Sequence, residues 1–167
     1  MIEHFLYPGN IFAEGEDSVI TTILGSCVSV CLWDPVLKVG GMNHYLLPLW
    51  NGDGLPSPKY GNIAIPKLID KLLYYGCNVK SLRAKTFGGA AVIERTTTSG
   101  LLNVGERNIF ICRDMLEEAG IPIVASDLGG TNGRKIIFQT DTGGVLMKKI
   151  KKTTEVVGVG NNKKEKK

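Results

Sequence analysis

Short stretches rich in apolar and β-branched residues, separated by turn residues, predict six or seven strands in this chain. Two other stretches have apolar residues at helical spacing: one begins at Pro66 and ends at Gly76, and the other begins near Gly105 or Glu106 and ends at Gly120. This order of elements predicts an α+β fold with a mostly antiparallel sheet system and two main helices. The strands are expected at residues 18–24, 28–33, 41–47, 82–87, 121–126, 135–140 and 145–150.

The first three of these strands are expected to form a meander, which would bring residues 27 and 44 onto neighbouring strands. Residues 50–59 follow, and their polar, Pro- and Gly-rich composition predicts a long loop. A chain of 167 residues, 43% of them hydrophobic, can build one domain around a substantial core. We expect this single domain to span residues 1–150.

Positive charge is concentrated at the C-terminal end of the chain. The formal net charge is +4, yet residues 148–167 alone hold eight lysines and two glutamates, so the rest of the chain is slightly acidic. Residues 151–167 are therefore expected to form a basic, disordered tail. The acidic body argues against nucleic-acid binding as the main role.

Targeting signals are not evident in the sequence. No basic start followed by an apolar run marks a signal peptide, and no stretch has the length and apolar character of a membrane span. We therefore expect a cytoplasmic protein without membrane insertion, whose four cysteines are reduced.

A cysteine and a histidine are the candidate reactive pair. Cys27 lies at a glycine-marked turn between two expected strands, and His44 lies in the strand that follows. A neighbouring imidazole that accepts the thiol proton would allow acyl transfer through a thioester, and a thiol activated in this way should have a lowered pKa. Taken singly, each residue also has an ordinary alternative as a buried core residue. The cysteine spacing does not match a zinc site, so no metal is expected.

Other groups would complete such a site. A third residue normally holds the imidazole in one orientation, and the hydroxyl of Thr21 or Thr22 could do so. Only one of these threonines can face the site, because consecutive strand side chains alternate. The backbone N–H groups near Gly25 and Ser26 could stabilise an oxyanion. The remaining candidates for oxyanion or substrate contacts are Asn43, Phe87 and Gly88.

Six sequence motifs, in a fixed order, carry a family resemblance. They are Leu24-Gly25-Ser26-Cys27-Val28, Gly41-Met42-Asn43-His44-Tyr45-Leu46-Leu47-Pro48, Ala84-Lys85-Thr86-Phe87-Gly88-Gly89-Ala90, Gly105-Glu106-Arg107-Asn108, Asp127-Leu128-Gly129-Gly130 and Gly133-Arg134-Lys135. In these motifs the chain resembles CheD, the family of chemoreceptor glutamine deamidases of bacterial chemotaxis. The resemblance runs from about Tyr7 to Ile150, and the residues beyond it are not covered.

This resemblance implies a fold, a catalytic triad and a substrate. The fold would be an α/β sandwich similar to the catalytic domain of cytotoxic necrotizing factor toxins. The triad would be Cys27, His44 and Thr21, a choice between the two threonines that comes from the resemblance alone. The enzyme would convert glutamines on the cytoplasmic helices of methyl-accepting chemotaxis receptors to glutamate, with no metal, nucleotide or organic cofactor. Some family members also bind the CheC phosphatase, which makes CheC a candidate partner.

Two other functions remain open from the sequence. The chain could be a non-catalytic regulatory binding module for receptors or for the CheC phosphatase. It could also be a thiol peptidase or a transglutaminase-like enzyme, because these use similar chemistry at the carbonyl carbon.

Overall fold

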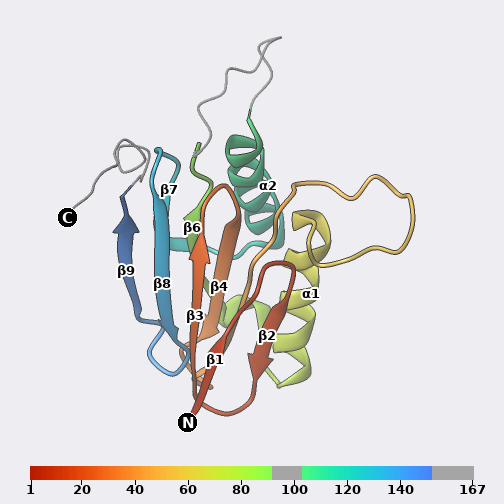
Figure 1. The fold of residues 1–167 in the computed structure, drawn as a ribbon. Helices are drawn as coiled ribbons and strands as arrows, with labels where there is room; N and C mark the ends of the chain where they lie inside the picture. Colours follow the sequence, from red (N-terminus) through yellow and green to blue (C-terminus); the bar gives the residue numbers. More distant parts are fainter. Residues whose placement is uncertain (92–102, 152–167) are drawn as a thin grey trace, which may run out of the picture.

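The structure is a computed structural model that describes residues 1–91 and 103–151. Within these residues, nine strands form two sheets, and two α-helices lie beside one of the sheets (Figure 1). The first sheet has the order β1 (Ile2–Phe5), β3 (Ser18–Leu24), β8 (Gly133–Gln139) and β9 (Val145–Ile150). The second has the order β2 (Ile11–Glu14), β5 (Val39–Asn43), β4 (Val28–Asp34), β6 (Arg83–Gly88) and β7 (Ile123–Leu128). The helices are α1 (Gly61–Tyr74) and α2 (Val104–Ala119), and a short 3₁₀ helix, η1, spans Val79–Ser81.

The second sheet is the middle layer of three. All seven residues of β4 are buried, because the first sheet covers one face of this strand and the helices cover the other. The core between the sheets contains Ile20, Leu24, Cys31, Trp33, Met42, Phe87, Ile136 and Phe138. The core between the second sheet and the helices contains Val28, Val30, Leu32, Leu68, Leu72, Ile111, Cys112 and Leu116. Alternate residues of β4 therefore belong to different cores.

The predicted α+β class with two main helices is confirmed. Among the strands of the described residues, five of the seven pairs are antiparallel, and the pairs β1–β3 and β6–β7 are parallel. Each of the seven predicted strands corresponds to an observed strand, whereas β1 and β2 were not expected. The predicted long loop at residues 50–59 contains no helix or strand. Among the described residues, no helix has the length and apolar character needed to cross a membrane.

Two predicted boundaries are wrong by more than two residues. Helix α1 begins at Gly61, so Pro66 lies inside the helix instead of at its first turn; the N-cap, Tyr60, makes no side-chain cap, which removes the usual start signal. Strand β5 ends at Asn43 and does not continue to residue 47. The predicted tail at residues 151–167 lies outside the described residues except for Lys151.

The predicted meander of the first three strands is also wrong. Strand β3 pairs with β1 and β8 in the first sheet, whereas β4 pairs with β5 and β6 in the second. Residues 25–27 therefore carry the chain from one sheet to the other. This crossing places Cys27 at the edge of the core between the sheets, within reach of side chains from both.

Candidate active site

The crossing segment at Cys27 is fixed by its backbone. The carbonyl of Cys27 accepts a hydrogen bond from the N–H of Gly89 at 2.8 Å, and the carbonyl of Gly25 accepts one from the N–H of Ala90 at 3.0 Å. The side chain of Cys27 is partly exposed and packs against the core between the sheets. The segment after β6 thus holds the cysteine at a position that a substrate can reach.

Gly88 allows this close contact between the two segments. Its φ of +112° favours glycine, and a Cβ at this position would overlap the carbonyl oxygen of Cys27. Gly88 therefore lets the end of β6 approach the cysteine backbone, and its expected contact with the substrate or the oxyanion stays a prediction.

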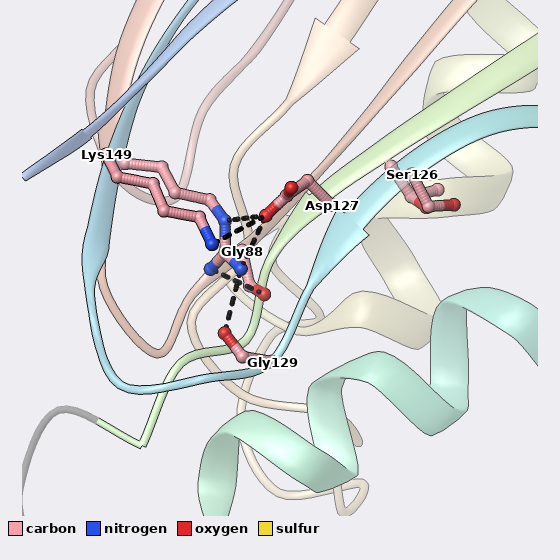
Figure 2. A network of polar contacts seen from close by, with 7 residues as sticks. Gly88, Ser126, Asp127, Gly129 and Lys149 are labelled. Carbon is pink, nitrogen blue, oxygen red and sulfur yellow. Dashed lines mark hydrogen bonds and ion pairs between the residues drawn. The ribbon is translucent and has the colours of Figure 1, made fainter.

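A buried arginine holds the same strand ends from the other side. Figure 2 shows the polar network around Gly88, Asp127, Gly129 and Lys149. The guanidinium of Arg134, which is only 2% exposed, donates to Asp127 at 2.8 Å, to the carbonyl of Gly129 at 2.8 Å and to the carbonyl of Gly88 at 3.2 Å. Arg134 therefore ties β8 of the first sheet to the ends of β6 and β7 in the second.

His44 lies directly after β5 and faces the same core as Cys27. Val28 and Tyr45 exchange two backbone hydrogen bonds, at 3.2 Å and 3.0 Å. Cys27 and His44 flank this bridge as diagonal neighbours on one face, a separation that side chains can span. The expected placement of both residues on neighbouring strands holds only approximately, because Cys27 directly precedes β4 and His44 directly follows β5.

The hydroxyl of Thr22 holds the imidazole. Its Oγ1 lies 2.7 Å from Nδ1 of His44 and 2.7 Å from the carbonyl oxygen of Leu6. The hydroxyl has one proton, and the carbonyl can only accept, so Thr22 donates to Leu6 and accepts from Nδ1–H of His44. The proton of the neutral ring therefore lies on Nδ1, and Nε2 carries the lone pair of a base.

The expected choice of Thr21 as the partner of His44 is wrong. Thr22 shares the buried face of β3 with Ile20 and Leu24, whereas Thr21 lies on the opposite, less buried face. The partner hydroxyl comes from the other sheet, across the core. The sequence contains a signal for Thr22. Side chains alternate between the two faces of a strand, and Thr22 shares its face of β3 with the apolar residues Ile20 and Leu24, which are expected in the core.

Burial sets the charge states of the pair. It lowers the pKa of His44 from 6.5 to about 4. Burial also raises the pKa of the Cys27 thiol above its ordinary 9.0, although the backbone N–H of Cys27 opposes this in part. The expected lowered thiol pKa is therefore wrong in direction, and both groups are neutral at pH 7. With both groups neutral, transfer of the thiol proton to Nε2 would accompany a nucleophilic attack by the sulfur.

The backbone supplies candidate oxyanion donors. Within residues 1–91 and 103–151, the N–H groups of Ser26 and Cys27 donate to no other residue's oxygen. The expected oxyanion or substrate contacts of Asn43 and Phe87 stay predictions, and both side chains are buried. Asn43 faces the helices and accepts from the N–H of Val30 at 2.8 Å, and Phe87 is 6% exposed in the core between the sheets.

His4 and three further cysteines are the remaining candidate ligands or bases. The second histidine, His4, is exposed and stacks on Phe12, and Cys31, Cys77 and Cys112 are buried. Across the described part of the chain, no three His, Cys, Asp or Glu side chains gather where they could hold a metal ion.

Fold and site together define a class of protein. It is an α+β sandwich in which a thiol, an imidazole and a hydroxyl gather where the chain crosses between two sheets. Thiol-dependent hydrolases use groups of these three kinds.

Comparisons with known proteins narrow this class. A family model described as "CheD chemotactic sensory transduction" matches residues 46–149. A protein of Sulfurimonas denitrificans named "Probable chemoreceptor glutamine deamidase CheD" is 52% identical over 149 residues, which cover 89% of this chain and 95% of the relative. A protein of Trichlorobacter lovleyi with the same name is 51% identical over 145 residues, which cover 87% and 89%. The chain therefore belongs to the CheD family.

A solved structure is similar only in part. The crystal structure of the Bacillus licheniformis hypothetical protein YfiH aligns with a TM-score of 0.42 at 17% identity, covering 69% of this chain and 49% of that one. At this score the likeness carries no functional argument. The expected similarity to the cytotoxic necrotizing factor domain stays a prediction.

Proposed function

We propose that this protein deamidates glutamine side chains of chemoreceptors, converting them to glutamate through a thioester on Cys27. The observation that carries the proposal is the hydrogen bond between Thr22 and His44, which leaves Nε2 as a base on the face that Cys27 shares. The relatives named above supply the substrate class, because both are named as chemoreceptor glutamine deamidases.

The first half-reaction makes the thioester. As the sulfur of Cys27 attacks the carboxamide carbon, its proton moves to Nε2 of His44. The N–H groups of Ser26 and Cys27 stabilise the negative oxygen of the tetrahedral intermediate. The C–N bond then breaks, the leaving nitrogen takes the proton from His44, and ammonia departs.

The second half-reaction hydrolyses the thioester. His44 accepts a proton from water as the water attacks the same carbonyl carbon, and the oxyanion again lies against the two N–H groups. The C–S bond breaks, and the sulfur regains its proton from His44. The sum is one glutamine and one water converted to one glutamate and one ammonium ion.

The proposed setting follows from the substrate. The glutamines would lie on cytoplasmic helices of methyl-accepting receptors, so the enzyme would act in the cytoplasm. Residues 1–150 would form a single catalytic domain. The two half-reactions as proposed require no metal or organic cofactor. A CheC phosphatase would be a regulatory partner.

Mass spectrometry of a receptor cytoplasmic fragment incubated with the protein tests the proposal. Each converted glutamine should gain about one mass unit, as expected for hydrolysis of an acyl-enzyme. An unchanged receptor fragment, bound by the protein with or without CheC, would instead indicate a regulatory binding module.

A labelled amine added to the same reaction separates related thiol chemistries. Incorporation of the amine into the receptor would indicate a transglutaminase, and backbone fragments would indicate a peptidase. Glutamate as the sole product is the result expected for a deamidase.

A further inference from the structure

Asn108 of α2 joins the two halves of the candidate active site. Its amide nitrogen donates to the carbonyl of Ser26 at 3.0 Å and to the carbonyl of Leu46 at 2.9 Å. Ser26 directly precedes Cys27, and Leu46 follows His44 by two residues. One fully buried side chain therefore holds both the cysteine segment and the histidine segment.

The contact with Ser26 fixes the direction of an oxyanion donor. A peptide unit is planar and trans, so its carbonyl and its N–H point in opposite directions. The carbonyl of Ser26 points to Asn108, and the N–H of Cys27 in the same peptide unit must therefore point away from α2. That N–H has no other oxygen as acceptor among the described residues, and it lies against the sulfur of its own residue.

The carbonyls on either side are held by backbone groups. The N–H of Ala90 holds Gly25, and the N–H of Gly89 holds Cys27. Of the three consecutive carbonyls at this crossing, the middle one alone depends on a side chain among the described residues. Rotation of this peptide unit is thus opposed by Asn108.

Asn108 itself is well anchored. The N-terminus of α2 has a capping box formed by Asn103 and Glu106, and the hydroxyl of Tyr45 donates to the backbone carbonyl of Asn108 at 2.6 Å. Both partners of the side-chain amide are carbonyls, so its nitrogen must face them. Its Oδ1 is buried without a partner in the described residues, so the side chain contributes through its two N–H groups.

We propose that Asn108 is a positioning residue that orients the Ser26–Cys27 peptide unit, so that the N–H of Cys27 is pre-aligned for the oxyanion. The inference rests on the proposed thioester mechanism. Asn108 does not touch the reacting atoms, and its effect reaches the reaction through the peptide plane.

Kinetics of Asn108→Ala and Asn108→Ser test the inference. We expect kcat for receptor deamidation to fall about tenfold or more in Asn108→Ala, because a misaligned oxyanion donor acts only in the transition state, while KM stays within about twofold. If Asn108→Ala does not fold, the same measurement is made with Asn108→Ser. Cys112→Ala is the matched control, since Cys112 is a buried residue one turn along α2, and its kcat should stay near wild type.

Alkylation of Cys27 by iodoacetamide gives a second readout. Alkylation forms no oxyanion, so its rate should fall far less than kcat in the Asn108 variants, and its pH profile should move only slightly to higher pH as the N–H of Cys27 turns away from the sulfur. An unchanged kcat would overturn the inference, and so would an equal loss of alkylation and kcat, which would indicate general disorder of the site. If the wild-type protein does not deamidate receptors, the proposed function fails before the variants are compared.

Discussion

At the scale of single residues, the proton on the hydroxyl of Thr22 decides which imidazole nitrogen can act as a base. The carbonyl of Leu6 uses that proton, and Nδ1 of His44 must then supply its own to Thr22. Nε2 is left free because of a contact made by a residue from the other sheet. The tautomer of His44 therefore depends on the packing of the two sheets against each other and not on the local sequence around His44.

Replacing the hydroxyl by a methyl group tests this assignment. Thr22→Val keeps the shape of the side chain but removes the acceptor for Nδ1–H, so the imidazole loses its fixed orientation. One such hydrogen bond contributes about 1–2 kcal/mol, so kcat for deamidation should fall about 5- to 30-fold. Thr21→Val is the matched control on the opposite face, and it should keep kcat within about twofold. Loss of activity in Thr21→Val alone would contradict the assignment.

The depressed pKa of His44 makes a prediction about stability. The imidazole stays neutral in the folded protein down to about pH 4, whereas in the unfolded chain it protonates near 6.5. The unfolded state thus binds more protons between these values, and the free energy of unfolding should fall as the pH drops from about 6.5 to about 4. The loss attributable to this residue is on the order of 3 kcal/mol.

Urea unfolding at several pH values measures this effect. Subtracting the free energy of unfolding of His44→Gln from that of the wild type at each pH cancels the contribution of the other titrating groups. We expect the wild type to lose more stability than the variant over this pH range. Parallel curves for the two proteins would show that His44 is not buried as a neutral ring.

The candidate pair itself could be predicted from the sequence, but its environment could not. Cys27 and His44 stand out because the thiol lies at a glycine-marked turn and the imidazole, one of only two in the chain, lies on an expected strand that follows. Their pKa values depend on burial between two sheets, which residue spacing does not reveal. The choice between Thr21 and Thr22 likewise depends on which face of β3 meets the second sheet.

At the scale of elements, the sequence predicts the positions of strands with a strong apolar pattern, but it does not predict which strands pair with one another in a sheet. Strands β1 and β2 are four residues each at the edges of their sheets, and their mixed composition gives little signal. Sheet membership depends on long-range pairing, as in the pairing of β3 with β8. That is why the strand spacing predicts a meander through Cys27, whereas the chain passes there from one sheet to the other.

Arg134 gives a prediction at this scale, because it joins elements of both sheets beside the site. Arg134→Met leaves Asp127 and two backbone carbonyls without their donor, so the free energy of unfolding should fall by about 2–4 kcal/mol. Lys149→Met is the control: Lys149 is 52% exposed and lies 3.9 Å from the same carboxylate, so its loss should cost less than about 1 kcal/mol. Urea denaturation of both variants measures the difference, and equal losses would contradict the anchoring role.

At the scale of the whole molecule, the three layers explain how one thiol can be both held and accessible. Helices and the first sheet bury the two faces of the middle sheet, so its strands are rigid supports for the residues at their ends. Cys27 lies where the chain leaves the first sheet and enters the second, partly exposed, with His44 buried behind it. A receptor glutamine needs to reach only the sulfur and the N–H groups beside it.

The most direct test is the rate at which a receptor cytoplasmic fragment gains mass with wild type, Cys27→Ala and Cys31→Ala. Cys31 is the control, a buried cysteine on the same strand face that packs against Met42. The account predicts about one mass unit per converted glutamine with wild type and Cys31→Ala, and a rate lower by about 10³-fold or more with Cys27→Ala. Undiminished conversion by Cys27→Ala would contradict it.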